Sequence, residues 1–167
     1  MDEQAKKTAL RMIPYGLYVL TSEAKDGRVV ASTVNWVTQT SFAPPLVAVG
    51  VKADSAAHEV IKQSRVFALN VLGKGQQDLA FAFFKTVERE GDTIGGQAFS
   101  SGESGAPIFT AAAGFVECSL VDTLEKGDHS LFLGEVTGAG VTGEISGRPD
   151  DATLALADLG ERTFYGG

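Results

Sequence analysis

The sequence VVASTVNWVTQTSFAPPLVAVGV, which spans residues 29–51, decides the fold of this chain. Its two ends, 29–37 and 46–51, are rich in β-branched and apolar residues, and each has the length of a strand. The loop between them ends in Pro44-Pro45, and proline cannot donate a hydrogen bond to a neighbouring strand. The stretch therefore predicts two strands with a polar connection between them.

The same signals recur on both sides of this stretch and predict a chain made mainly of strands. Further strands are predicted at 15–21, 67–72, 114–121 and 130–139, and a short strand at 141–145 would be the seventh. Short helices are predicted at 3–12, 55–64 and 76–85, and the Gly- and Ser-rich residues 88–105 are predicted to form a long surface loop. Strands and helices do not alternate regularly, which favours a closed or partly closed antiparallel barrel over a doubly wound sheet.

Length and charge limit the classes of protein to which the chain can belong. Its 167 residues suffice for one domain with its own apolar core. No run of eighteen apolar residues is present, so no transmembrane helix is expected, and the polar residues 1–7 lack the features of a secretory signal. We therefore expect a cytoplasmic protein. The net charge of −7 argues against a nucleic-acid partner, although a few local donors could still bind a small anion.

Several familiar kinds of catalytic site lack their residues. Two histidines and one cysteine cannot supply a three-histidine metal site or an internal disulfide, so no metal is expected. The chain also has no Gly-rich phosphate loop, no Gly-x-Ser-x-Gly elbow and no Rossmann fingerprint. Cys118 lies in the apolar alternation of residues 115–120, and we expect it to pack as an inert strand residue rather than act as a nucleophile.

The first segment that could carry chemistry is the polar stretch 32–41, where the predicted strand leads into the loop that ends in Pro44-Pro45. Eight of its ten positions hold hydrogen-bonding or amphipathic side chains: Ser32, Thr33, Asn35, Trp36, Thr38, Gln39, Thr40 and Ser41. A ligand with many hydrogen-bonding edges would use such a set. The alternative is a Thr-rich edge strand with ordinary turn chemistry.

Two further segments hold candidate ligand-binding residues. At residues 52–58 a strand ends and a helix begins, where Lys52, Ser55 and His58 could surround a phosphate at the helix N-terminus. The alternative is that Ser55 is a simple N-cap and His58 lies on a solvated face. In the turn 125–129, His129 could contact a cofactor or donate to a substrate carbonyl or amide, or the Gly-Asp-His triplet could be structural.

Five motifs carry a resemblance to a known family. They are residues 13–21, 32–36 with 41–47, 67–72, 127–129 with 134–136, and the aromatic-Gly-Gly end at 164–167. In this order and spacing they resemble the flavin reductase-like family of FMN-binding split barrels, particularly its flavoredoxin-type branch. The resemblance covers most of the chain. It implies one domain, 1–167, with a mainly β fold, an antiparallel split β-barrel of Greek-key type with a few short helices.

The resemblance also implies a function. It is that of an FMN-binding flavoprotein, a homodimer, in which NADH or NADPH delivers hydride to the flavin and the flavin passes electrons to an acceptor. Two alternatives remain: a flavoredoxin-like carrier that serves a redox protein partner, and a flavin-binding homologue without turnover. Donors placed near the flavin would stabilise its reduced form, whichever reading holds.

Site residues follow from the same resemblance. It assigns the ribityl chain and pyrimidine edge to Thr33, Val34, Asn35, Trp36, Gln39 and Ser41. It assigns the phosphate to Lys52, Ser55 and His58, and a further approach to the cofactor to Phe84 and Lys85. Trp36 could pack on the apolar end of the flavin, and His129 would act on the nicotinamide side. Ala57 departs from the family, which often has threonine there.

Overall fold

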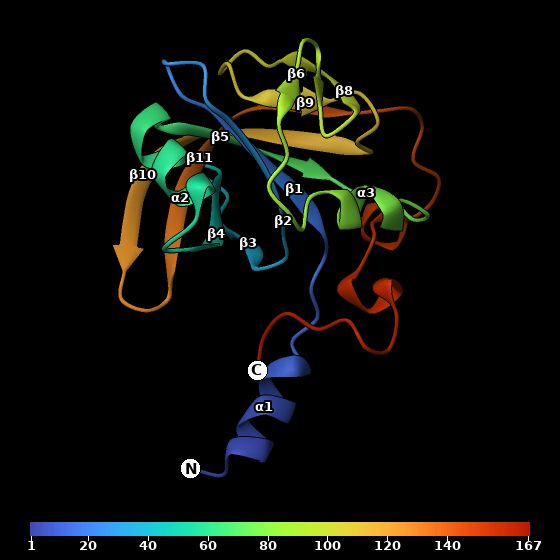
Figure 1. Ribbon diagram of the computed structural model, residues 1–167. Coiled ribbons are helices and arrows are strands. Elements are labelled where there is room, and N and C mark those ends of the chain that lie inside the picture. The colour runs from blue at the N-terminus through green and yellow to red at the C-terminus, as the bar shows by residue number, and fades with distance from the viewer.

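Seven strands form one antiparallel sheet in the computed structural model, which describes residues 1–167 (Figure 1). Their spatial order is β2-β1-β5-β10-β11-β4-β3. The strands are β1 (Tyr18–Glu23), β2 (Val29–Val34), β3 (Val37–Ser41), β4 (Leu46–Lys52), β5 (Val66–Val71), β10 (Gly114–Glu125) and β11 (His129–Val141). Neighbours such as β1 and β5, or β4 and β11, lie far apart in sequence, so the sheet depends on long-range pairing.

The sheet closes on itself because its two edge strands are consecutive in sequence. Only Asn35 and Trp36 separate the end of β2 from the start of β3. Three steps of about 3.8 Å between Cα atoms bring these ends within about 11 Å of each other. A seven-stranded sheet can satisfy that limit only by curling. The predicted antiparallel barrel is therefore confirmed, with its split at Asn35 and Trp36, where the predicted strand 29–37 breaks.

The barrel interior is filled by apolar side chains that alternate inward along the strands. Leu20, Val49, Phe67 and Phe132 are fully buried there, and full burial of such a side chain contributes roughly 1.5–3 kcal/mol. Cys118 belongs to the same cluster, and burial raises the pKa of its thiol to about 12. The expectation that Cys118 packs as a strand residue is confirmed.

Close packing also explains one glycine of β11. A Cβ atom added at Gly134 would lie 2.7 Å from the Cβ of Cys118 and 2.7 Å from Cζ of Phe67. No real side chain tolerates such contacts. Glycine at this position therefore lets β11 pass over the Phe67 ring and keeps the barrel closed.

A second apolar cluster lies outside the barrel, beneath a small sheet. This sheet is built from β6 (Arg89–Glu90), β7 (Thr93–Ile94), β8 (Gln97–Ser101) and β9 (Pro107–Phe109). With α3 (Gln77–Ala82) it covers a cluster that includes Phe83, Ile94 and Phe109. The predicted surface loop 88–105 is therefore wrong. Its glycines form the tight turns of short hairpins, with positive φ at Gly91, Gly95 and Gly96.

Other boundaries differ less from the prediction. β10 and β11 run on to Glu125 and Val141, so that residues 142–145 form no separate strand. The helix predicted at 76–85 is the shorter α3. Two single-turn 3-10 helices, Pro149–Ala152 and Leu156–Leu159, follow the barrel, and Leu154 between them is fully buried.

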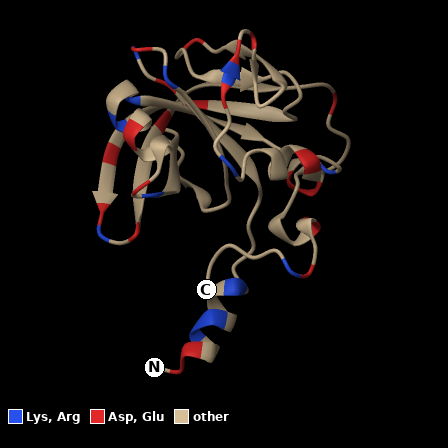
Figure 2. Ribbon diagram, in the orientation of Figure 1, with Lys and Arg blue, Asp and Glu red and all other residues tan.

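The two ends of the chain lie together, below the barrel in the view of Figure 1. The helix α1 (Glu3–Arg11) projects from the body and buries none of its residues. Figure 2 shows Lys and Arg residues along α1 after the acidic first turn, whereas acidic residues are spread over the rest of the chain. Arg11 ties the C-terminus to this helix: its Nε donates to the carbonyl of Gly166 at 3.2 Å, and its guanidinium lies 4.3 Å from the Phe164 ring centroid. No helix of the chain is both long and apolar enough to cross a membrane.

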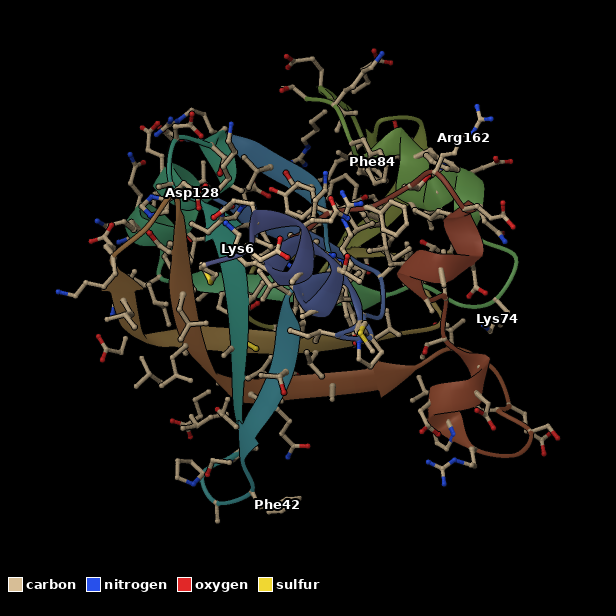
Figure 3. The ribbon with its side chains drawn as sticks, turned by 90° about the horizontal axis from the view of Figure 1, so that it is seen from below. Lys6, Phe42, Lys74, Phe84, Asp128 and Arg162 are labelled. Carbon is tan, nitrogen blue, oxygen red and sulfur yellow. The ribbon has the colours of Figure 1, made fainter.

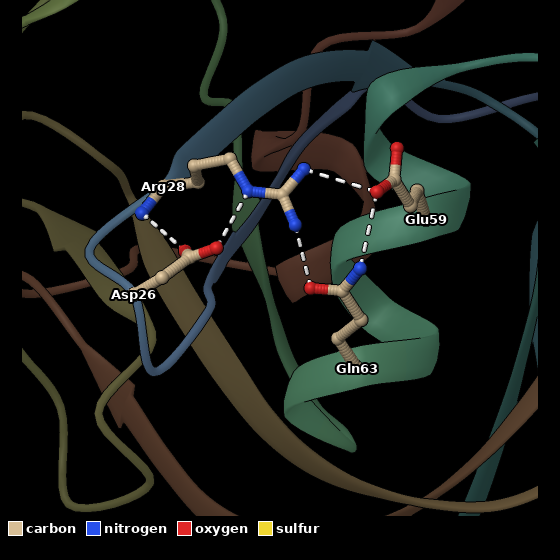
Figure 4. A network of polar contacts seen from close by, with 4 residues as sticks. All are labelled: Asp26, Arg28, Glu59 and Gln63. Carbon is tan, nitrogen blue, oxygen red and sulfur yellow. Dashed lines mark hydrogen bonds and ion pairs between the residues drawn. The ribbon is translucent and has the colours of Figure 1, made fainter.

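A polar network fixes α2 (Ala56–Ser64) against the turn between β1 and β2 (Figure 4). Arg28 donates to Asp26 at 2.9 Å, to Glu59 at 3.1 Å and to Gln63 at 2.6 Å. Both Glu59 and Gln63 belong to α2, and Gln63 also donates to Glu59. The groups are exposed, so we assign the network to orientation rather than to stability. It helps to fix the direction in which the N-terminus of α2 points.

Candidate functional site

A cleft of about 620 Å³ opens where β3, β4 and β11 lie side by side. Its walls come from residues 13–15 before β1, 36–38 at the start of β3, Ala48 and Gly50 of β4, and 128–131 at the start of β11. This volume lies within the range of small-molecule sites. Two of the residues proposed from the sequence, Trp36 and His129, line it together.

The indole of Trp36 is held against β4. The N–H of Gly50 donates to the Trp36 carbonyl at 2.8 Å, and a Cβ added at Gly50 would lie 3.0 Å from the indole ring. Glycine at this position therefore makes room for the ring. The indole centroid lies 4.6 Å from that of His129 and 5.4 Å from that of Tyr165. Trp36 is thus packed between β4 and two other side chains.

The indole nitrogen of Trp36 is buried but has no hydrogen-bond partner. A buried donor left unpaired costs about 1–3 kcal/mol. Gly166 lies beside this nitrogen, where an added Cβ would come within 3.6 Å of it, and its φ of 133° favours glycine at this position. A ligand with carbonyl oxygens or unprotonated ring nitrogens would supply the missing acceptor. The chemistry of this donor fits a flavin.

His129 begins β11 and is held through both of its ring nitrogens. Nδ1 lies 2.9 Å from Oδ1 of Asp128, and Nε2 lies 2.7 Å from the hydroxyl of Tyr165. The hydrogen bond from His129 lowers the pKa of the Asp128 carboxyl, which is therefore ionised at neutral pH. His129 also pairs with Lys52 across the ladder between β11 and β4. Two segments 77 positions apart in sequence thus meet at this edge of the sheet.

The segment after β4 forms a helix N-terminus with free donors. Ser55 is the N-cap of α2, as one of the two readings of the sequence predicts: its Oγ accepts from the N–H of His58 at 3.2 Å and donates to the Lys52 carbonyl at 2.7 Å. The N–H groups of Ala56 and Ala57 have no acceptor within the chain. Nζ of Lys52 lies 3.1 Å from Asp54. The free N–H groups and this cation fit a phosphate group.

His58 does not extend toward that N-terminus. Its Nε2 lies 2.9 Å from Oγ of Ser130 and 3.3 Å from Glu125, and its ring packs edge-on against Phe132. The ring therefore closes the barrel end under α2, and only 9% of the residue is exposed. The reading that placed His58 on a solvated face is wrong, because His58 shares a helix face with the buried Ile61.

The other predicted residues are distributed around the barrel split. Asn35 is buried and its Nδ2 donates to the Tyr165 carbonyl at 3.1 Å. Thr33 bonds to α3 through Ala80 and Phe83, which places the exposed Phe84 and Lys85 near β2. Val34 packs against the barrel core.

Gln39 and Ser41 lie at the far end of β3, where Gln39 donates to the Ser41 carbonyl at 3.1 Å. Figure 3 shows that Phe84 and Phe42, the neighbour of Ser41, stand on opposite sides of the molecule. The predicted residues thus form several groups. Of all the residues predicted for the site, only Trp36 and His129 line the cleft.

Two tyrosines, one lining the cleft and one in contact with its wall residues His129 and Trp36, have no role assigned from the sequence. Tyr15 lines the cleft, and Tyr165 bonds to His129 and packs on Trp36. The aromatic-Gly-Gly end is visible in the sequence, but its docking site lies 36 positions away from it. No local pattern could have connected the two.

Comparisons with known proteins agree on one family. A family model described as "Flavin reductase like domain" matches residues 10–160. The chain is 32% identical over 136 residues to the "Stachydrine N-demethylase reductase subunit Stc3" of Rhizobium meliloti, covering 81% of this chain but only 58% of that relative. It is 30% identical over 140 residues to the "NADH-dependent flavin reductase StyB" of Pseudomonas fluorescens, covering 84% of this chain and 79% of that relative.

A solved structure extends the likeness to the fold. The NADH:FAD oxidoreductase SgcE6 of Streptomyces globisporus, in complex with NAD and FAD fragments, superimposes with a TM-score of 0.74 at 28% identity. The match covers 97% of this chain and 92% of that one. The split-barrel fold expected from the sequence is therefore confirmed.

Proposed function

The chain belongs to the flavin reductase-like family, and from that premise we propose that it is an FMN-binding flavin reductase that uses NADH or NADPH. The observation that carries this proposal is the buried, unpartnered indole N–H of Trp36 beside the cleft. This donor lacks an acceptor, and the residue that carries it lines a cleft of suitable size next to His129. A flavin offers acceptors of the required kind along its ring.

The chain's own residues divide the work of binding. Trp36 would donate to the flavin and pack against it, and Asn35, whose amide is now bonded to the C-terminal segment, adjoins it. The free N–H groups of Ala56 and Ala57, with Ser55 and Lys52, would hold a phosphate. A terminal phosphate that meets a helix N-terminus and a lysine favours FMN as the cofactor.

When bound, the flavin supplies hydride acceptance from the nicotinamide and electron transfer to an acceptor. His129 would orient the nicotinamide at the cleft wall, because its ring is fixed by Asp128 on one side and Tyr165 on the other. The fixed ring limits the orientations that a bound donor can adopt, which lowers the entropic cost of reaching the reactive geometry.

An anaerobic titration of the FMN-loaded protein with NADH, and separately with NADPH, tests the proposed activity. We expect one equivalent of at least one nucleotide to bleach the visible absorption of the bound flavin. A flavin that stays oxidised with both nucleotides contradicts the reductase function. Reduction by a protein donor alone would favour the second candidate, an electron carrier, which is supported by the relative named as the reductase subunit of a demethylase.

We also propose that the protein is a homodimer. The helix α1 buries no residue within its own chain, and the side chain of Phe42, at the tip of the β3–β4 turn, is 90% exposed (Figure 3). Leu124 and Leu131 add exposed apolar surface on the β10–β11 hairpin. We propose that these exposed groups contact a second chain, because a two-fold interface is the commonest form of assembly.

Light scattering checks the oligomeric state. We expect a mass of about 35 kDa, twice the 17.5 kDa of one chain. The variant Phe42→Ser should shift the equilibrium toward monomer if the exposed ring lies in the interface. A mass of 17.5 kDa for the FMN-loaded protein would contradict the proposed homodimer.

A further inference from the structure

We propose that Tyr165 is a positioning residue for His129: its hydroxyl donates to Nε2 and holds the imidazole in one tautomer and one orientation against Trp36. The part of this proposal that concerns catalysis rests on the proposed reductase function. The part that concerns the imidazole itself does not.

The first support is geometric. The Tyr165 hydroxyl lies 2.7 Å from Nε2 of His129, and the two rings meet nearly edge-on, with centroids 5.7 Å apart. Both rings also pack on the indole of Trp36. The side chain of His129 is only 16% exposed, so its ring is enclosed by these neighbours.

The second support is the chemistry of the protons. Ionised Asp128 can only accept a hydrogen bond, so Nδ1 of His129 must carry a hydrogen. In a neutral imidazole the other nitrogen then has no hydrogen and must accept. The only group within reach of Nε2 that can donate is the Tyr165 hydroxyl. The direction of both hydrogen bonds is thereby determined.

The third support is that the C-terminal segment is anchored independently of His129. The carbonyl of Tyr165 accepts from Asn35 Nδ2 at 3.1 Å, and the carbonyl of Gly166 accepts from Arg11 Nε at 3.2 Å. Phe164 packs under the Arg11 guanidinium. These contacts hold the backbone on both sides of the hydroxyl, so Tyr165 can impose an orientation on His129 rather than follow it.

A ring held at both nitrogens cannot rotate by half a turn, which would exchange its nitrogen and carbon edges. The edge that faces the cleft therefore stays the same from one encounter to the next. Without the hydroxyl, only Asp128 would hold the ring, and its side chain is 93% exposed. Water could then replace the hydrogen bond from Nδ1, the ring could turn away from Asp128, and the Nε2–H tautomer would become accessible. The nicotinamide nucleotide would then meet a mixed population of His129 orientations.

Nitrogen NMR on protein labelled with ¹⁵N-histidine tests the tautomer directly. The chain has two histidines, so a His129→Ala sample identifies the signals of each. At a pH where the ring is neutral, we expect Nδ1 of His129 to be protonated and Nε2 to be unprotonated. Tyr165→Phe should move the shifts toward a mixture of tautomers. Tyr18→Phe removes a hydroxyl that makes no hydrogen bond to His129 and serves as the matched control.

Stopped-flow reduction of the bound flavin tests the consequence for the reaction. We expect Tyr165→Phe to raise the KM for the nucleotide about three- to tenfold with little loss of kcat, the size of effect expected for one hydrogen bond. In a His129→Ala background the same change should add nothing, because it acts only through that ring.

The outcomes separate the two claims. Tautomer shifts in Tyr165→Phe that match the unmodified protein would overturn the positioning role. So would an unchanged KM in Tyr165→Phe when His129→Ala slows reduction. If Tyr165→Phe changes the tautomer but His129→Ala does not affect reduction, Tyr165 still positions the ring, and it is the proposed role of His129 in the reductase that fails.

Discussion

Replacing Lys52 by alanine is expected to weaken FMN binding by about 1–3 kcal/mol, or roughly five- to 150-fold, and to leave riboflavin binding nearly unchanged. Lys52 stands at the end of β4, and the helix that follows it has two free N–H groups at its N-terminus. If these groups hold the phosphate, removing the cation costs affinity only for the ligand that carries a phosphate. Isothermal titration with both ligands measures the difference.

The matched control for this change is Lys74→Ala. Both lysines are more than half exposed, and each is paired with an aspartate, at 3.1 Å for Lys52 and 2.7 Å for Lys74. Lys74 lies beside the C-terminal 3-10 turn, away from α2, so its loss should alter neither affinity. Equal losses for FMN and riboflavin in Lys52→Ala would remove this residue from the phosphate site.

Ser55 needs a different comparison, because it also caps α2. Ser55→Ala should lose about 0.5–2 kcal/mol of stability along with some FMN affinity. Ser55→Asp keeps an N-cap acceptor but adds a negative charge beside the phosphate. It should therefore fold normally and bind FMN more weakly than Ser55→Ala, while riboflavin binds both variants alike.

The second large effect is expected at His129. His129→Ala should leave FMN affinity nearly unchanged and slow reduction by NADH or NADPH about ten- to hundredfold at low nucleotide concentration, the range for losing a well-oriented contact. If the ring only positions the nucleotide, the rate of flavin reduction should largely recover at saturating nucleotide concentration. A loss of binding that is equal in the ground state and the transition state raises KM and spares kcat. If it also stabilises the transition state, kcat should fall too.

Stopped-flow spectroscopy of flavin reduction distinguishes these cases. His58→Gln is a useful comparison, because His58 is the other histidine and bonds to Ser130 rather than to a residue of the C-terminal segment. Its reduction rate should stay close to that of the unmodified protein at matched flavin loading. An unchanged rate in His129→Ala at every nucleotide concentration would return this residue to a structural role.

The elements that the sequence predicted best are those with a local signal. β4 is an unbroken apolar run after two prolines, and α2 has a serine cap and an apolar face, so both are recognisable without the rest of the chain. The hairpins at 89–101 cannot be recognised from the sequence alone, because their strands are only two to five residues long. Their stability depends on packing such as the burial of Ile94, which no short window of sequence displays.

The candidate site likewise contains residues that a local sequence signal identifies and residues that it does not. Trp36 and His129 were selected for their chemistry, and the β3–β4–β11 ladder brings them together. The inward position of His58 was predictable, since a helical period places it on the face of Ile61. The docking of Tyr165 against His129 could not be predicted, because the irregular C-terminal segment lacks the helix or strand periodicity from which its path could be derived.

The indole N–H of Trp36 gives the most direct test of the account, because the chain has a single tryptophan and hence a single indole resonance in a ¹H–¹⁵N spectrum. We expect that resonance to shift as FMN is added, to saturate at one FMN per chain, and to exchange more slowly with solvent once the nitrogen has its acceptor. An indole resonance that stays in place while FMN binds would show that the flavin lies elsewhere, and would contradict the site proposed for this protein.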